Sequence, residues 1–408
     1  MLNPINTLKN QRVISIDAFR GITFLMMIIV NEIAGVNGVS IWLKHMPADA
    51  DAMSFPDIVF PAFLFIVGMS IPFGINHRLL KGDSFWFLNR HILLRAFALI
   101  VMGFFMVNAE DGFHQPSMPI SIHSWALLSY LGFMLIWGVY QFNSLILNRA
   151  LVGMGIAILI TLALLYRGGV DGSQTMLPQW WGILGLIGWA YLLSSWIYQL
   201  CRGKQKLLLI AILTCVALYA VIHSINTQLV GQTDFVVKLL LSLDGHAAHC
   251  SIVLSGLVCS LIFFEENQAN KQSEHLPQRF RNALLFAVSL IVLATILRPQ
   301  FKISKIYATP SWCLYSAAIC IIVFSFLYWI IDLKRSQSWV NLVKPAAINP
   351  LVCYLIPFVI EALLKLFNLP SPIHFFEGGT GIMASVIYAF FIISIVAALN
   401  KINFKLKF

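Results

Sequence analysis

The stretch NEIAGVNGVSIWLKHMPADADAMSFPDIVFP, residues 31–61, holds several groups that could do chemistry between two apolar stretches. His45 can exchange a proton near neutral pH, so it is a candidate general base for an attacking amine or hydroxyl. The amide of Asn31 could donate a hydrogen bond to a polarised carbonyl oxygen. Asp57 could orient His45, bind a cationic amino group or cap the helix that begins there. We take His45 and Asn31 as candidate catalytic residues and Asp57 as a candidate substrate contact.

A second set of polar residues lies outside this stretch. Asp17 and Arg20 are three residues apart and share one helical face, where Arg20 could hold a phosphate or the two could form a plain intrahelical pair. Lys305 and Trp312 lie in FKISKIYATPSW, where an aromatic ring could stack on a sugar or anchor the chain at the membrane interface. Asn349 precedes a proline in INPLVCY, which is first of all a helix-start signal. We treat Asp17 and Arg20 as candidate cofactor-binding residues and the other three as candidate substrate contacts.

The histidine and cysteine spacings do not predict a metal site. His246 and His249 are three residues apart in DGHAAH, but a metal site there would need more ligands. The seven cysteines include no CxxC pair, and most fall within apolar stretches. We therefore expect no bound metal and no disulfide framework, and interpret the cysteines as buried thiols.

The elements that position these residues must lie in a membrane. Of the 408 residues, 59% are hydrophobic and only 11% are charged, against about 25% charged in soluble domains, and the mean hydropathy is +0.83. This composition predicts an all-α polytopic transmembrane helical bundle. The net charge of +10 comes from basic residues scattered in short loops, which excludes a nucleic-acid-binding patch and instead reports membrane orientation.

Twelve apolar stretches are candidate spans, with a range of ten to twelve because several are short. We expect them to form a single domain over residues 1–408. The stretches are 14–35, 57–76, 92–108, 122–140, 150–166, 180–200, 207–223, 248–264, 282–297, 311–332, 346–364 and 380–399.

The Lys and Arg counts predict the orientation of these spans. With the N-terminus in the cytoplasm, 19 of the 27 Lys and Arg residues fall in cytoplasmic segments and 7 on the opposite side, while Arg20 lies within the first span. Cytoplasmic loops carry such an excess of basic residues. We therefore expect both termini to be cytoplasmic, His45 to face the opposite side, and Asp17 and Arg20 to lie near the cytoplasmic end of the first helix.

Several motifs together resemble one enzyme family. The runs are ISIDAFRG (14–21), VN (30–31), LKH (43–45) and FPDIVFPAFLFIVGMSIPF (55–73), followed later by ISKIYATPSWCL (303–314), LYWIIDLK (327–334) and INPLVCY (348–354). This combination resembles the heparan-alpha-glucosaminide N-acetyltransferase family, and the later runs look like its bacterial branch. The stretch from about 140 to 295 resembles the family only in its pattern of alternating hydrophobic and polar segments.

The resemblance implies transfer of acetyl from cytosolic acetyl-CoA to an amino sugar of the glucosamine type on the periplasmic side of a bacterial inner membrane. The family's proposed active-site histidine maps onto His45 and its neighbouring asparagine onto Asn31. Its Asp-x-x-Arg maps onto Asp17 and Arg20. A longer EIAGVNGVSIWLK separates Asn31 from His45, and MPADADAMS stands where the lysosomal branch has Trp-Asn-Gly. These departures lie on the acceptor side.

Other functions stay open at this point. Twelve spans with a few intramembrane charges also fit a secondary transporter of a sugar or related solute. An O-acetyltransferase acting on a cell-envelope glycan would use a hydroxyl acceptor in place of an amine. Within acetyl transfer, we favour direct transfer with His45 as general base over an acetyl-imidazole intermediate on the same residue. The expected partners are acetyl-CoA, a sugar acceptor and membrane lipids, with a homodimer possible and no nucleic acid.

Overall fold

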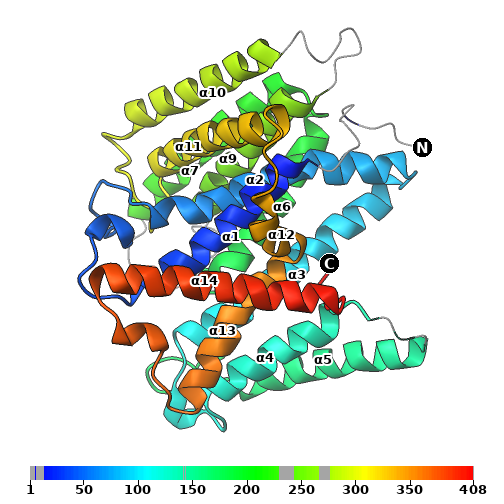
Figure 1. Cartoon of the computed structure of the whole chain (residues 1–408), viewed down its shortest axis with the longest axis vertical. Coiled ribbons are helices and arrows are strands. Elements are labelled where there is room, and N and C mark those ends of the chain that lie inside the picture. Colours follow the sequence, from blue (N-terminus) through cyan, green and yellow to red (C-terminus); the bar gives the residue numbers. More distant parts are fainter. Residues whose placement is uncertain are drawn as a thin grey trace. The chain divides into compact units, whose positions relative to one another are not determined.

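A computed structural model describes residues 5, 13–140, 142, 144–228, 243–265 and 276–407 of the chain. These residues form helices joined by short loops (Figure 1). The long helices are α1 Ile14–Ala34, α2 Pro56–Leu80, α3 Phe85–Glu110, α4 Ile122–Trp137, α5 Leu145–Leu165, α6 Gly182–Leu200, α7 Gln205–Gln228, α9 Leu243–Phe264, α10 Leu276–Leu297, α11 Pro310–Tyr328, α12 Val340–Ile348, α13 Pro350–Leu366 and α14 Gly378–Lys401. Short helical turns are η1 Ile41–Leu43, η2 Gln115–Ser117, η3 Trp329–Leu333 and η4 Pro372–Phe375.

The helices confirm the predicted polytopic membrane architecture. Among the described residues, ten helices are long and apolar enough to cross a membrane, and α12 with α13 would make an eleventh if they count as one span. The remaining predicted stretch, 122–140, forms α4, which has only 16 residues. Ten or eleven candidate spans lie within the predicted range of ten to twelve. The single domain and the cytoplasmic placement of the termini stay predictions.

One predicted span is broken. The stretch 346–364 was expected to be continuous, but α12 and α13 meet at Asn349 with a bend of 86°. The cause is local, because Pro350 disfavours helical geometry at the residue before it and Asn349 has φ −131° and ψ 62°. The expected helix start before Pro350 is therefore confirmed, with a separate helix in front of it.

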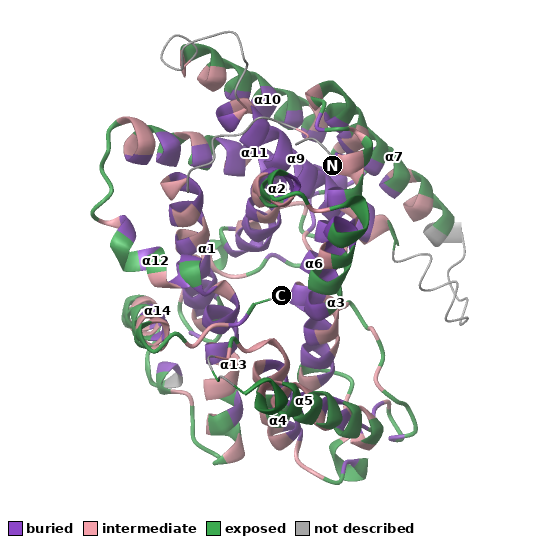
Figure 2. Ribbon diagram, turned by 90° about the vertical axis from the view of Figure 1, so that its right-hand side faces the viewer, coloured by how far each residue is buried: buried purple, intermediate pink, exposed green. Residues whose placement is uncertain are grey.

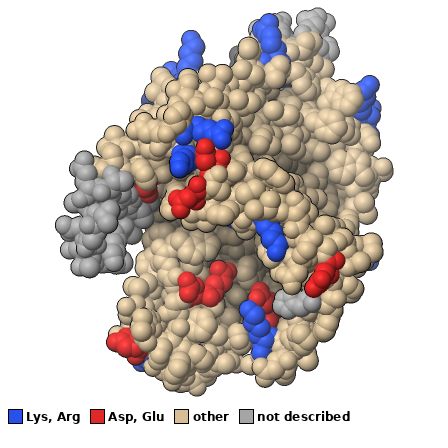
Figure 3. Space-filling model, turned by 90° about the vertical axis from the view of Figure 1, so that its left-hand side faces the viewer, with Lys and Arg blue, Asp and Glu red and all other residues tan. Residues whose placement is uncertain are grey.

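The chain divides into two compact units, which we describe separately. The first comprises Met1–Thr23, Ser40–Ala96 and Ile187–Ser338, and the second comprises Phe24–Val39, Phe97–Leu186 and Trp339–Phe408. In both, large apolar side chains remain exposed on the outer helices, as lipid-facing surfaces require (Figure 2). On the face drawn in Figure 3, acidic and basic side chains form a few small groups in an otherwise uncharged surface.

The first unit is built around α9, which packs against α2, α7 and α11 and is buried almost throughout. Two glycines allow the close approach of α2 and α9. A Cβ atom at Gly68 would lie 1.8 Å from the Val253 carbonyl oxygen, and one at Gly256 would lie 2.0 Å from the Phe65 carbonyl oxygen. Small residues at helix crossings allow such backbone contact in membranes. α10 covers α11 from outside and exposes most of its length (Figures 1 and 2).

The second unit pairs α4 with α5 and α13, and α12 with α14. The α4–α5 contact again uses glycines, since a Cβ atom at Gly155 would lie 2.9 Å from the Gly132 carbonyl oxygen. Buried Trp125 of α4 donates its indole N–H to the Leu162 carbonyl of α5 at 2.9 Å. The pairing is therefore held by close backbone packing and by a side-chain hydrogen bond across it.

Candidate active site

The loop between α1 and α2 presents His45 through a sequence of local turns. Ser40 begins the turn η1, and its hydroxyl accepts from the Trp42 N–H at 3.4 Å. The carbonyl of Trp42 then accepts from the Phe55 N–H at 3.2 Å, which closes the loop onto the start of α2. Pro56 occupies the first turn of α2, where its missing N–H costs nothing. His45 therefore projects from a loop that is tied at its base to the helix carrying Asp57.

His45 is hydrogen-bonded to a buried carboxylate. Its Nδ1 lies 2.7 Å from Oδ1 of Asp57, whose side chain is 2% exposed, while the His45 side chain is 42% exposed. A carboxylate accepts hydrogen bonds, so Nδ1 carries the proton in the neutral imidazole. The lone pair of Nε2 is then left to accept a proton from another molecule. This is the tautomer that a general base requires.

Asp57 is itself held in place by its other oxygen. Oδ2 accepts from the Ser54 N–H at 3.0 Å, the Ser54 hydroxyl at 2.8 Å and the Met46 N–H at 3.2 Å. The Asp57 carboxylate thus reaches back three residues to accept from both the N–H and the hydroxyl of Ser54. These bonds fix the carboxylate before any substrate binds. Its hydrogen bond to His45 fits the alternative in which Asp57 orients the ring, and the role of Asp57 stays a prediction.

Trp312 contacts the backbone of Asp57, the hydrogen-bond partner of His45. Its indole N–H donates to the Asp57 backbone carbonyl at 3.0 Å, and the side chain is fully buried on α11. The Trp312 ring meets the buried ring of His249 edge-on, with centroids 6.2 Å apart. The predicted contact between Trp312 and a sugar stays a prediction, because the indole here packs beneath Asp57.

Lys305 places an amino group beside the imidazole. Its Nζ lies 3.2 Å from Nδ1 and 3.2 Å from Nε2 of His45. Burial lowers the Lys305 pKa below its usual range, and the negative charge of Asp57 opposes this shift. Lys305 sits in a tight turn that Thr309 closes, since its hydroxyl accepts from the Ser304 N–H at 3.0 Å. Ala308 adopts a left-handed φ of 47° in the same turn.

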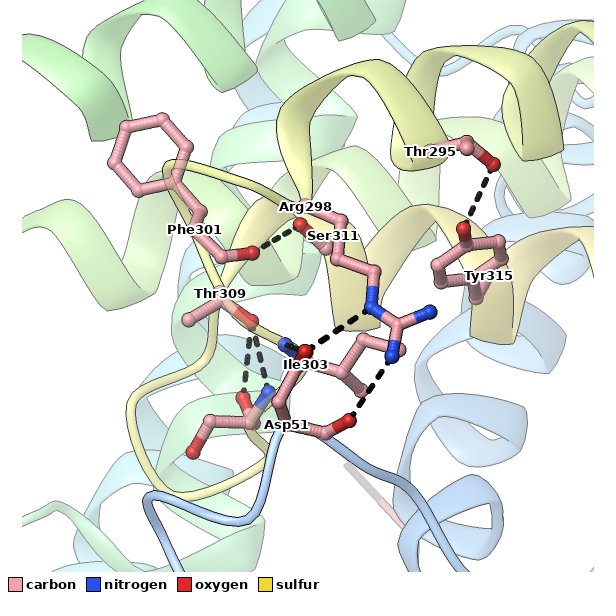
Figure 4. Close-up of polar contacts among 9 residues, drawn as sticks. Asp51, Thr295, Arg298, Phe301, Ile303, Thr309, Ser311 and Tyr315 are labelled. Atoms are coloured by element: carbon pink, nitrogen blue, oxygen red, sulfur yellow. Dashed lines mark hydrogen bonds and ion pairs between the residues drawn. The ribbon is translucent and has the colours of Figure 1, made fainter.

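An ion pair ties the loop of Lys305 to the loop of His45 (Figure 4). Nε of Arg298 lies 3.1 Å from Oδ1 and 3.2 Å from Oδ2 of Asp51. The same Oδ1 accepts from the Ile303 N–H at 2.9 Å, and the Arg298 Nη2 reaches the Asp51 carbonyl at 3.4 Å. These bonds hold the Asp51 pKa below its usual value, with the Ile303 N–H as the largest favourable cause. We call Asp51, Arg298 and Ile303 the loop latch.

Asp17 and Arg20 form the intrahelical pair that their spacing allows. Nη1 of Arg20 donates to Oδ1 of Asp17 at 3.0 Å, and Nη2 donates to the Ser70 hydroxyl of α2 at 2.9 Å. The Arg20 side chain is 23% exposed and the Asp17 side chain is 15% exposed. The Arg20 guanidinium is therefore oriented by side chains of α1 and α2 and remains partly exposed.

Asn31 and Asn349 belong to the second unit, whereas His45, Asp57, Lys305 and Trp312 belong to the first. Asn31 is exposed near the end of α1. Asn349 is 1% exposed at the α12–α13 break, and its side-chain N–H donates to the Phe404 carbonyl at 2.8 Å. The roles proposed for these two asparagines stay predictions.

The structure adds residues that the sequence did not single out. Asp51 and Arg298 are separated by 247 positions, and no local pattern links them. Ser54 and Ser70 could have been found, because Ser54 precedes Asp57 at the capping-box spacing and Ser70 lies on the apolar helix that follows. Within the described part of the chain, no three His, Cys, Asp or Glu side chains gather as metal ligands would.

This arrangement supports proton abstraction by His45. A buried carboxylate fixes the ring and would stabilise the imidazolium that forms when Nε2 takes a proton. The same ring could instead attack an acyl group directly. Either chemistry serves group transfer to a nucleophile that approaches Nε2.

Comparison with known proteins matches the segment that carries His45 and Asp57, whereas Arg298, Lys305 and Trp312 lie outside it. Residues 12–113 match the model of the catalytic region of heparan-alpha-glucosaminide N-acetyltransferase. The human protein named heparan-alpha-glucosaminide N-acetyltransferase is 38% identical over 98 residues, which is 24% of this chain and 14% of the human protein. The mouse protein of the same name is 35% identical over 94 residues, 23% of this chain and 13% of its own length. The resemblance is confirmed over this quarter of the chain, which carries His45 and Asp57.

Proposed function

We propose that this multi-pass membrane protein is an acetyltransferase that moves the acetyl group of acetyl-CoA to the amino group of a glucosamine-type sugar. The observation that carries the proposal is the 2.7 Å bond between His45 and buried Asp57, which lies within the residues matching the catalytic region of heparan-alpha-glucosaminide N-acetyltransferase. The curated relatives supply the reaction class through their names.

In the proposed reaction, His45 Nε2 takes a proton from the sugar amine as the nitrogen attacks the thioester carbonyl. Asp57 holds the ring and balances the positive charge of the imidazolium. A hydrogen-bond donor is needed for the carbonyl oxygen as negative charge develops there, which is the role predicted from the sequence for Asn31. The C–S bond then breaks, and CoA leaves as its thiol.

The donor and the acceptor approach from opposite sides in this proposal. Arg20, with Asp17 as its partner, binds a phosphate of CoA at the cytoplasmic end of α1. The pantetheine arm is long and thin enough to carry the thioester towards His45 on the periplasmic side. Lys305 is the proposed acceptor contact, because its amino group lies 3.2 Å from the His45 ring nitrogens. We place the protein in the bacterial inner membrane, with lipids around it and a homodimer as a possible assembly.

The test is acceptor-dependent release of free CoA from the purified full chain. Acetyl-CoA is supplied alone, with glucosamine and with N-acetylglucosamine, which lacks the free amine. The proposal expects sustained CoA release, many molecules per protein chain, with glucosamine only. Release with both sugars would point to a hydroxyl acceptor and hence to O-acetylation. No release with any amino sugar, together with no binding of acetyl-CoA, would contradict the proposal.

A secondary transporter is the second candidate, and one observation favours it. α12 and α13 break at Asn349 with a bend of 86°, and helices interrupted in this way form the binding sites of many transporters. Uptake of labelled sugar into vesicles without acetyl-CoA would support transport. Uptake that is absent while glucosamine is acetylated would exclude it.

A further inference from the structure

We propose that Lys305 is itself an acetylation site and that the protein modifies this residue when no sugar acceptor is bound. The proposal rests on the proposed function, because it uses the same donor and the same base. Its basis is the placement of a primary amine 3.2 Å from Nε2 of His45. Nζ lies equally far from Nδ1, so it contacts the imidazole, and rotation of the lysine side chain must bring it onto the Nε2 lone pair for His45 to remove its proton.

The position of Lys305 is fixed by its surroundings. The 304–309 turn is closed by hydrogen bonds between Ser304 and Thr309, and the loop latch joins the preceding residues to Asp51. The amine is therefore presented to His45 by the fold. Such positioning converts an encounter between two molecules into a reaction within one complex.

The neighbouring Lys302 lacks these features. It lies on the same loop, three residues earlier, and its side chain is exposed. Among the described residues, Lys302 forms no hydrogen bond to His45. The Lys305 amine, in contrast, lies 3.2 Å from both ring nitrogens of His45. Burial shifts the Lys305 pKa downward, which increases its neutral, nucleophilic fraction.

The reaction balances with acetyl-CoA as the only co-reactant. The Lys305 ammonium passes a proton to His45 Nε2, and the neutral amine attacks the thioester carbonyl to form a new N–C bond. The C–S bond breaks, its electron pair leaves with sulfur, and the thiolate takes up one proton while the second is released to water. The products are Nε-acetyl-Lys305 and CoA thiol.

Acetylation of Lys305 would change the site. The modified side chain loses its positive charge and leaves a neutral amide beside Nε2, where the sugar amine must approach. The amide bond is far less reactive than the thioester, so this acetyl group does not pass on to the sugar. Modification therefore inactivates the chain, and a bound acceptor protects it.

The experiment follows acetylation of the full chain by peptide mass spectrometry after incubation with acetyl-CoA in the absence of sugar. Lys305 should gain one acetyl group, Lys302 should remain largely unmodified, and glucosamine in the mixture should slow the modification. The variant His45→Gln should lose acetylation of Lys305. Lys305→Arg should abolish the modified peptide, while Lys302→Arg should leave the acetylation of Lys305 unchanged.

The outcomes separate this inference from the proposed function. If glucosamine is acetylated but Lys305 is not, the inference fails and the function stands. If Lys302 and Lys305 are acetylated equally, or His45→Gln leaves the extent unchanged, the modification is chemical acetylation by the thioester and the inference is overturned. If neither glucosamine nor Lys305 accepts an acetyl group while acetyl-CoA is present, both proposals fail.

Discussion

Asp51 and Arg298 are 247 residues apart in the chain, yet their ion pair joins the loop that carries His45 to the loop that carries Lys305. The carboxylate also accepts from the Ile303 N–H. The Asp51 side chain therefore binds both the Arg298 guanidinium and the Ile303 backbone N–H of the other loop. The distance between the Lys305 amine and the His45 ring depends on this latch.

We predict that Asp51→Ala lowers acetyl transfer more than it lowers stability. The Asp51 and Arg298 side chains are 35% and 46% exposed, so loss of their ion pair should change the folding free energy little. Misplacement of the loops should still reduce kcat/KM on the order of tenfold, because reactive groups must be held closely. The matched control is Asp83→Ala, which breaks the similar Arg78–Asp83 pair at 2.8 Å in another loop. Equal activity losses in the two variants would contradict a specific role for the latch.

The latch also predicts a dependence of stability on pH. The folded-state pKa of Asp51 lies below its usual value of 3.8, so the folded state binds this proton less readily than the unfolded state. The stabilisation is present above pH 3.8 and disappears as the pH falls through the folded pKa. Thermal unfolding of wild type and Asp51→Asn should therefore differ at pH 6 and converge in acid. A difference that stays constant down to the lowest pH would contradict this assignment.

Asp57→Asn should reduce kcat by about 100-fold or more while the protein remains folded. The amide keeps the volume of the side chain but removes the charge that balances the imidazolium, and general acid–base catalysis contributes roughly that factor. Asp49→Asn is the control, because Asp49 is an exposed carboxylate in the same loop. Steady-state transfer assays on both variants provide the measurement, and similar rates for the two would remove Asp57 from its role.

The close crossing of α2 and α9 gives a prediction about stability. Gly68→Ala should destabilise the protein by about 1–3 kcal/mol or more, because a Cβ atom there would lie 1.8 Å from the Val253 carbonyl oxygen. Gly74→Ala on the same helix should be tolerated, since nothing lies within 4 Å of a Cβ atom there. Unfolding of both variants in detergent checks this. An equal effect of the two substitutions would contradict the packing account.

The membrane architecture could be predicted from the sequence because spanning helices must be long and apolar. Each predicted stretch overlaps a described helix. Pro350 correctly marked a helix start, but the sharp bend at Asn349 was not expected, because the hydrophobic run 346–364 continues across it. Average hydropathy reports burial in lipid and does not report helix direction.

The candidate site could be predicted where its polar residues are close together in the sequence. His45 and Asp57 are 12 positions apart, and both stood out as polar residues beside apolar spans. Lys305 and Trp312 were expected as substrate contacts, but their contacts with His45 and Asp57 depend on tertiary packing. The loop latch could not be predicted, since an acidic and a basic residue on distant loops carry no pairing signal.

The most direct test of the account compares two histidines in acetyl transfer to glucosamine. His45→Gln removes the base bonded to Asp57, whereas His114→Gln changes another loop histidine, whose Nδ1 lies 2.8 Å from the Ser117 hydroxyl. Formation of N-acetylglucosamine from acetyl-CoA is measured for both variants and for wild type. The account predicts that His45→Gln loses the activity and His114→Gln retains it. Full activity in His45→Gln would contradict the central claim.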